Sequence, residues 1–309
     1  MIRVAINGFG RIGRSILRLA LSNSYNSIEI VAINDINCPD TLAYLFQYDT
    51  IHGKFSKAVT LDNDYLKIES TSILLLQEKK INKLPWHQLK IDVVIEATGL
   101  FTKAEYLCEH IRAGAKKVVL TTVSKDDLPI IVMGVNQEIY NPNVHHVISN
   151  ASCTTNCLAP IIKILHEKFG IMEGLMTTVH AVTSSQRTVD SISGKNIRLG
   201  RAAFANIIPS TTGAAIAVTK IIPELKGKLT GMAFRVPVLN VSTIDLTLKL
   251  NKPTTFQKIC ELMEEQSNHR FKGILGYTDQ PVVSSDCIGT TFSGIFDATI
   301  AVSYTHLTL

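Results

Sequence analysis

Residues Ile2–Gly13 read IRVAINGFGRIG, and this stretch decides the fold of the first half of the chain. The short apolar run at its start predicts a strand, and a glycine-rich turn follows directly. Gly8 permits a tight turn, Gly10 lets the backbone approach a pyrophosphate, and Gly13 lets a helix pack closely on the strand. The start of that helix offers free N–H groups and the positive end of the helix dipole. We therefore predict dinucleotide contacts from Gly8, Gly10, Arg11, Ile12 and Gly13.

The acidic residue after the second strand identifies the dinucleotide. Asp35 follows Asn34 at the distance expected for a carboxylate that hydrogen-bonds the adenosine ribose. A carboxylate at this place would repel a 2′-phosphate, so the pattern favours NAD over NADP as the cofactor.

Short β-branched runs alternate with helical stretches through residues 1–151. Such runs, apolar on both faces, are typical of parallel strands buried between helices. The strands are expected at 2–6, 28–33, 91–97, 118–120 and 144–148, and helices at 11–21 and 103–112. Ile12, Ile16, Leu19 and Ala20 are expected to form the buried side of the first helix. This organisation predicts an α/β domain with a doubly wound parallel (Rossmann) sheet.

Residues 152–302 show a different pattern, typical of an α+β domain with a mostly antiparallel sheet. Longer strands are expected at 174–182, 229–236 and 241–250, and the last alternates apolar and polar side chains. Helices are expected at 153–169 and 254–266. The polar segment 184–206 carries Gly194 and Gly200 and lacks periodicity, which predicts a long ordered loop with a functional role.

The composition excludes several classes of protein. The 309 residues are 46% hydrophobic and carry a formal net charge of +5, without a basic cluster that would indicate nucleic acid. Six scattered cysteines are too few for a disulfide scaffold and do not stand at metal-ligand spacing. The chain begins directly with a predicted strand and has no long apolar run, so we expect a cytoplasmic protein without a bound metal or membrane partner.

Cys153 is the candidate nucleophile. It is expected at the first position of a helix, where free N–H groups and the helix dipole stabilise a thiolate. An average cysteine is a small buried residue, and Cys157, one turn further on, fits that description better.

The segment Ser149–Cys157, SNASCTTNC, resembles the active-site segment of the glyceraldehyde-3-phosphate dehydrogenases. Further similarities follow in the family's order along nearly the whole chain. They are INGFGRIGR (6–14), YDTIHGKF (48–55), EATG (96–99), TTVHA (177–181), PSTTGAA (209–215) and GMAFRVP (231–237).

The resemblance implies a reaction and its residues. Cys153 would attack the aldehyde, and His180 would be the general base that pairs with the thiolate and takes the hydroxyl proton as hydride leaves. The substrate phosphate would bind at Thr183 and Arg235. The attacking inorganic phosphate would bind at Ser152, Thr154, Arg201, Thr212 and Gly213. Arginine and hydroxyl side chains suit phosphate oxygens because they are hydrogen-bond donors.

The family's cofactor residues match Thr98, Gly99 and Thr121. Thr121–Ser124 stands where the family usually has a Ser-Ala-Pro-Ser turn that lines the nicotinamide, and Ile192 stands where NAD-specific members often have proline. After Ala301 the family pattern is expected to stop, so that residues 303–309 form a tail outside the family.

The resemblance also implies a homotetramer with the 184–206 loop at a subunit interface. Two alternatives stay open at this point. One is an erythrose-4-phosphate dehydrogenase, which uses the same fold and chemistry on a longer sugar with water as the acyl acceptor. The other is a truncated, non-catalytic NAD-binding protein.

Overall fold

The computed structural model describes residues 1–22, 27–193 and 196–301, which form two compact units. The first unit contains Met1–Ile131 and Glu138–Ser152, and the second contains Val132–Gln137 and the described residues from Cys153 onward. The chain therefore enters the second unit at 132–137, returns, and leaves the first unit finally after Ser152, whereas the sequence suggested one crossing near residue 151. Gly194 and the predicted tail at 303–309 lie outside the described residues.

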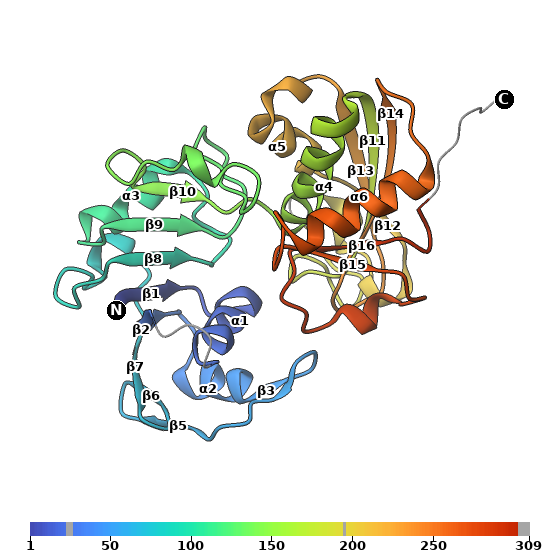
Figure 1. The fold of residues 1–309 in the computed structure, drawn as a ribbon. Coiled ribbons are helices and arrows are strands. Elements are labelled where there is room, and N and C mark those ends of the chain that lie inside the picture. Colours follow the sequence, from blue (N-terminus) through green and yellow to red (C-terminus); the bar gives the residue numbers. More distant parts are fainter. Residues whose placement is uncertain (23–26, 194–195, 302–309) are drawn as a thin grey trace. The chain divides into compact units, whose positions relative to one another are not determined.

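The first unit is built on an eight-stranded sheet in the order β10-β9-β8-β1-β2-β7-β6-β5 (Figure 1). Neighbours from β10 to β7 pair in parallel, which confirms the predicted parallel sheet, and β7, β6 and β5 continue it as an antiparallel extension. The strands are β1 (Ile2–Asn7), β2 (Ile28–Asn34), β5 (Val59–Asp62), β6 (Tyr65–Ile68), β7 (Thr71–Leu76), β8 (Val93–Glu96), β9 (Lys117–Leu120) and β10 (Val147–Ser149).

Helices cover both faces of this sheet. Alternate residues of β1 enter two different cores: Val4 and Ile6 pack with Leu17 of α1, whereas Ala5 packs with Leu107 of α3. Burial on both faces explains why these strands are apolar throughout. The other described elements of this unit are α1 (Arg11–Ala20), α2 (Pro39–Gln47), α3 (Ala104–Arg112), the short strands β3 (Tyr48–Asp49) and β4 (Gly53–Lys54), and a 3-10 turn at Ile81–Lys83. A further 3-10 turn, Gln137–Ile139, lies where the chain returns to the first unit.

The prediction of the buried side of α1 was wrong in part. Ile12 is 47% exposed and Leu19 is 50% exposed, while Gly13 and Leu17 are the buried residues of the helix. Ile16 and Ala20 are partly buried against the same core. The helix therefore turns the side that carries Gly13 toward the sheet, because a glycine brings the helix and strand backbones closest together.

The second unit contains a four-stranded sheet in the order β12-β13-β11-β14. The outer pairs are antiparallel, as predicted, but the central pair of β11 and β13 is parallel, so both of these strands end at the same edge of the sheet. The strands are β11 (Ile171–His180), β12 (Ile208–Thr211), β13 (Leu229–Arg235) and β14 (Thr243–Leu250); β15 (Leu275–Thr278) and β16 (Gly294–Asp297) form a separate parallel pair.

The described residues of the second unit also form α-helices, which are labelled in Figure 1. They are α4 (Cys153–Phe169), α5 (Ala214–Ile221) and α6 (Phe256–Asn268), with 3-10 turns at Pro223–Leu225 and Ser284–Cys287. In the predicted loop 184–206, the described residues form 3-10 turns at Ile197–Gly200 and Ala203–Ala205 and a bridge between Arg187 and Ala202. Within the described ranges, no helix is long and apolar enough to cross a membrane.

Candidate active site

Three glycines shape the turn between β1 and α1. Gly8 has φ +95°, and a Cβ there would lie 2.5 Å from the backbone nitrogen of Thr98. A Cβ on Gly13 would lie 2.2 Å from the carbonyl oxygen of Gly8, whereas one on Gly10 would meet nothing within 4 Å. Gly10 precedes α1 without a side-chain cap, and the first turn of α1 carries no acidic residue. The glycines thus bring helix and strand together and leave an open helix start suited to an anion.

The other predicted cofactor residues follow the ends of neighbouring strands. Asp35 follows β2, and its carboxylate accepts a 2.8 Å hydrogen bond from the backbone N–H of Phe9 in the glycine turn. Thr98 and Gly99 follow β8, and Thr121 follows β9, where it donates from its hydroxyl to the Glu96 carbonyl at 3.0 Å. Since β9, β8, β1 and β2 are adjacent and parallel, all these residues lie at one edge of the sheet. They fit a bound dinucleotide.

A strained backbone turn positions Cys153. Ala151 is buried and has φ +60°, a left-handed conformation that is uncommon for residues other than glycine. The Ser149 hydroxyl holds this turn, because it donates to the Thr122 carbonyl at 2.7 Å and accepts from the Ala151 N–H at 3.1 Å. Helix α4 then begins at Cys153 itself. The turn delivers an exposed thiol to a helix start, and such strain is typical of functional sites.

Cys153 lies next to His180, the last residue of β11. The distance from Cys153 Sγ to His180 Nε2 is 3.5 Å, within hydrogen-bond range for sulfur, and the Thr154 hydroxyl lies 3.9 Å from the same sulfur. The atoms packed around the sulfur act to raise the pKa of Cys153. The hydrogen bond and charge of His180, with help from Thr154, outweigh this effect and leave the pKa of the thiol below its ordinary value.

Arg235 contacts the other side of the His180 ring. It ends β13 and is the register partner of His180 in the parallel pair. Its Nη1 lies 2.7 Å from His180 Nδ1 and 3.2 Å from the Ala181 carbonyl, which itself lies 2.6 Å from Nδ1. Nδ1 can thus accept from the guanidinium or donate to the carbonyl. Either arrangement leaves Nε2 facing the sulfur, so the ring is placed to give and take a proton there.

Cys157 has the opposite chemistry, although it lies on the same helix. Burial, reinforced by the charge of Cys153, raises the pKa of Cys157 to about 11. Its sulfur packs so closely against Gly294 that a Cβ there would lie 2.6 Å away. The two thiols therefore differ physically, because the surroundings of Cys153 lower its pKa and those of Cys157 raise its pKa.

The hydrogen bonds of the predicted phosphate ligands Thr183, Thr212 and Arg201 do not, within the described residues, join them to the pair of Cys153 and His180. Thr183 bonds to Ser185 at 3.0 Å between their hydroxyls, and the Thr212 hydroxyl accepts from the Ala214 N–H as α5 begins after Gly213. Arg201 is exposed and pairs with Asp190 at 2.9 Å. Among the described residues, no hydrogen bond joins Thr183, Thr212 or Arg201 to Cys153 or His180. Ser152 is half-buried directly before the thiol.

Sequence reasoning missed the residues that hold the site in place. Ser149, Asp190 and the Ala181 carbonyl had not been singled out. Ser149 holds the turn before Cys153, Asp190 pairs with Arg201, and the Ala181 carbonyl contacts His180. A signal existed for Ser149, a hydroxyl side chain at the end of an apolar strand and immediately before the helix. The backbone carbonyl of Ala181 carries no signal in a sequence.

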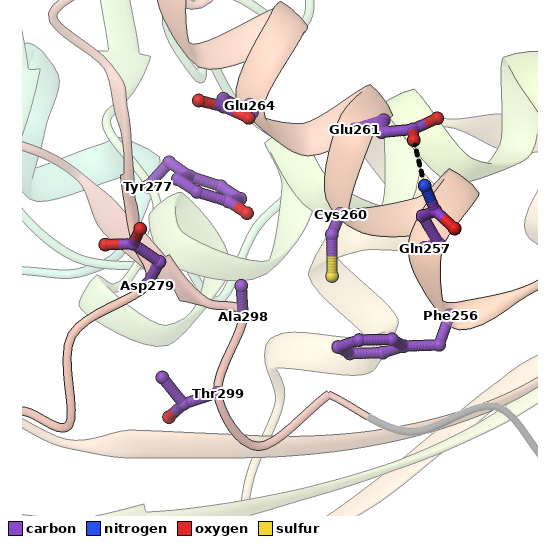
Figure 2. A pocket seen from close by; sticks show the side chains of 9 residues that line it. All are labelled: Phe256, Gln257, Cys260, Glu261, Glu264, Tyr277, Asp279, Ala298 and Thr299. Atoms are coloured by element: carbon purple, nitrogen blue, oxygen red, sulfur yellow. Dashed lines mark hydrogen bonds between the residues drawn. The ribbon is translucent and has the colours of Figure 1, made fainter.

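A separate cavity lies elsewhere in the second unit, beside α6 and β15 (Figure 2). Its lining includes Cys260, Tyr277 and Asp279, and Gln257 donates to Glu261 across one turn of α6 at 2.8 Å. The lining contains none of the predicted site residues. In the described part of the chain, no group of three or more His, Cys, Asp or Glu side chains could hold a metal ion.

Comparisons with known proteins agree on one family. Residues 2–104 match the model of the glyceraldehyde 3-phosphate dehydrogenase NAD binding domain, and residues 152–308 match that of the C-terminal domain. The second match thus includes most of the segment 303–309 that the sequence analysis had placed outside the family.

Individual relatives cover almost the whole chain. A glyceraldehyde-3-phosphate dehydrogenase of Chlamydia pneumoniae is 54% identical over 98% of this chain and 90% of its own length. One from Buchnera aphidicola is 51% identical, and glyceraldehyde-3-phosphate dehydrogenase 2 of Saccharomyces cerevisiae is 50% identical, with the same coverage.

Proposed function

The chain belongs to the glyceraldehyde 3-phosphate dehydrogenase family, and on this premise we propose that it oxidises D-glyceraldehyde 3-phosphate in glycolysis. The reaction uses NAD and inorganic phosphate, yields 1,3-bisphosphoglycerate, and proceeds through a thioester. The observation that carries the proposal is the 3.5 Å contact between Cys153 Sγ, exposed at a helix start, and His180 Nε2.

The thiol and the imidazole together perform the oxidation. The Cys153 thiolate attacks the aldehyde carbon, and the resulting alkoxide takes a proton from His180 Nε2 to give a hemithioacetal. His180 then takes the hydroxyl proton back as the carbon is oxidised and the acyl thioester forms. Bound NAD supplies the hydride acceptor for this step. A positioned base of this kind contributes ~10²–10⁴-fold to the rate.

Inorganic phosphate completes the reaction. A phosphate oxygen attacks the thioester carbonyl carbon, the C–S bond breaks, and the acyl phosphate leaves with Cys153 restored as the thiolate. Arg235 and Thr183 are assigned to the substrate phosphate. The assignment of Arg235 is supported by its position at the strand end next to His180 and by its buried Nε, which lacks a protein partner within the described residues. Ser152, Thr154, Arg201, Thr212 and Gly213 are assigned to the attacking phosphate.

The cofactor is held by the first unit. The helix start after Gly10, including Arg11 and Ile12, would bind the pyrophosphate, and Asp35 would bind the adenosine ribose. Thr98, Gly99 and Thr121 would complete the site along the same sheet edge. Measuring the affinity of the protein for NAD and NADP by calorimetry tests this arrangement, and equal affinities would refute the role of Asp35.

The assembly is proposed to be a homotetramer in the cytoplasm. Apolar side chains in and beside the 184–206 loop support a subunit interface there. They are Val189 (70% exposed), Ile192 (91%), Ile197 (85%), Phe204 (51%) and Ile207 (68%). Large apolar side chains that are exposed in one segment of the chain favour an interaction site there. Light scattering should give four times the chain mass, and a monomer would contradict the proposal.

A direct assay separates this activity from its nearest alternative. We expect turnover of glyceraldehyde 3-phosphate to depend on inorganic phosphate and to exceed the turnover of erythrose 4-phosphate. A preference for erythrose 4-phosphate that persists without phosphate would indicate the other dehydrogenase. A protein that binds NAD but oxidises neither aldehyde would indicate a non-catalytic role.

A further inference from the structure

A fully buried carboxylate lies at the carboxyl end of β8, between the strands that carry the cofactor residues. Glu96 has 0% of its surface exposed, and four hydrogen-bonding groups of the described residues contact its carboxylate. Asn7 Nδ2 donates to Oε2 at 2.6 Å, and His110 Nε2 lies 3.1 Å from the same oxygen. The backbone N–H of Thr98 donates to Oε1 at 2.9 Å, and the Thr98 hydroxyl also bonds to Oε1.

The other hydrogen bonds of these partners show which atom is the donor in each hydrogen bond to Glu96. Trp86 Nε1 donates to His110 Nδ1 at 2.9 Å, so Nδ1 is an acceptor and the neutral ring carries its proton on Nε2, facing Glu96. The Thr98 hydroxyl accepts from the Leu100 N–H at 3.1 Å, so its own hydrogen points to Glu96. All four partners are therefore donors. Because a protonated carboxyl would itself need an acceptor, the arrangement fits an ionised carboxylate.

The hydrogen bonds of Glu96 continue to the ends of β1 and β2. Asn7 immediately precedes the glycine turn, and its Oδ1 accepts from Asn34 Nδ2 at 2.7 Å. Asn34 immediately precedes Asp35, and its Oδ1 accepts from the backbone N–H of Glu78 at 2.8 Å. The residues directly before Gly8 and Asp35 are thus fixed, through two amides, to one carboxylate.

The same residue fixes the loops after β8 and β9. Its carboxylate holds Thr98, against whose backbone Gly8 packs so closely that no Cβ would fit between them. Its backbone carbonyl accepts both the N–H and the hydroxyl of Thr121, at 3.1 and 3.0 Å. Four strand ends that carry predicted cofactor residues therefore depend on Glu96.

We propose that Glu96 is a positioning residue for the dinucleotide site, holding the glycine turn and the Thr98–Leu100 loop in the conformation that binds NAD. The inference rests on the proposed function, since it concerns the same cofactor. Stability alone is a weak reason for a buried charge, because buried ions are often replaced by apolar residues without loss of stability. A negative charge beneath a pyrophosphate site also does not help to attract the ligand. The carboxylate of Glu96 instead fixes the positions of its four partners, because both of its oxygens can only accept hydrogen bonds.

Glu96→Gln tests the proposal with almost no change of shape. Whichever way the amide turns, its NH2 group faces two donors, either Asn7 and His110 or the two groups of Thr98. We expect the dissociation constant for NAD, measured by calorimetry without substrate, to rise roughly tenfold to a hundredfold, as expected when a charged hydrogen bond is lost. Glu29→Gln is the matched control, because Glu29 is at the opposite end of β2 and pairs only with exposed Arg3 in the contacts described. Its dissociation constant should equal that of the wild type.

A second variant returns a carboxylate to the network. In Asn7→Asp/Glu96→Gln the new carboxylate accepts from Asn34 and from the glutamine amide, so NAD affinity should recover in part. Unchanged affinity in Glu96→Gln, together with a lower melting temperature, would show that Glu96 is only structural and would overturn the proposal. Failure of the double variant to recover would also count against it. If the wild type itself binds no NAD, the proposed function fails instead.

A measurement on the wild-type protein guards against variants that do not fold. Hydrogen exchange without NAD should show the Thr98 amide already protected, since Glu96 holds it before the cofactor arrives. A Thr98 amide that exchanges freely until NAD is added would mean that the cofactor, and not Glu96, orders the loop.

Discussion

Replacing Gly13 by alanine should damage both the fold of the first unit and its affinity for NAD. The new Cβ would lie 2.2 Å from the Gly8 carbonyl oxygen, whereas ordinary contacts begin at 3.4 Å, so α1 must move by about 1 Å. Gly8 cannot give way, because it has φ +95° and is itself packed against the backbone of Thr98.

Two opposing effects decide the sign of the change in stability. Alanine in a helix interior is favoured over glycine by about 1 kcal/mol, whereas overpacking typically costs ~1–3 kcal/mol. Because the clash here is between two backbone segments, we expect the upper part of that range and a net loss of about 1–2 kcal/mol. At ~2–4 °C for each kcal/mol, the melting temperature of the first unit should fall by several degrees.

Gly10→Ala is the matched control for Gly13→Ala. Gly10 has φ −74° and open space around its Cα, so the free energy of unfolding should change by less than about 0.5 kcal/mol. NAD affinity should nevertheless fall, since the methyl group occupies the space through which a pyrophosphate would approach the helix start.

Thermal unfolding and NAD calorimetry on both variants test this reasoning. We expect Gly13→Ala to be impaired in both measurements and Gly10→Ala in the second alone. A Gly13→Ala protein that melts and binds NAD like the wild type would refute the close packing of α1 on β1. Unchanged NAD binding by Gly10→Ala would refute the placement of the pyrophosphate.

Three further predictions concern individual side chains. His180→Asn should lower kcat by ~10²–10⁴-fold. It should also raise the pKa of Cys153, so that the pH profile of alkylation moves to higher pH; an unchanged profile would contradict the contact at 3.5 Å. Iodoacetamide at pH 7 should label Cys153 and spare Cys157, whose pKa is raised to about 11, and peptide mass spectrometry showing Cys157 labelled first would reverse the assignment. Asp35→Ala should reduce kcat/KM with NAD more than with NADP, whereas an equal loss with both would mean that Asp35 only supports the turn at Phe9.

The parallel core of the first unit was predictable from the sequence because its strands are buried on both faces. Burial on both faces selects continuous apolar runs, and β1, β2, β8 and β9 show them. The antiparallel extension β5–β7 was missed, because these short strands are recognised mainly by their pairing with the sheet edge. The orientation of α1 was missed for a different reason. Apolar side chains at Ile12 and Leu19 suggested a buried face, but Gly13, which has no side chain to count, decides how the helix packs.

The candidate site was also predictable from the sequence only in part. A cysteine at a predicted helix start was visible in the sequence, and so was the glycine turn. The pairing of His180 with Arg235 depends on the parallel register of β11 and β13, which places these two residues, 55 positions apart, side by side. Register between distant strands is set by tertiary packing and leaves no local pattern. For the same reason the pairing of Arg201 with Asp190, within a loop that lacks periodicity, could not be foreseen.

The central claim is that an acyl thioester forms on Cys153, and mass spectrometry of the trapped enzyme tests it most directly. The protein is mixed with glyceraldehyde 3-phosphate and NAD in the absence of phosphate, quenched in acid and digested. We predict that the peptide containing Cys153 gains the mass of a 3-phosphoglyceroyl group, that phosphate added before the quench removes it, and that Cys153→Ser carries no adduct. An adduct on Cys157, or NADH formation without any adduct on Cys153, would contradict the account.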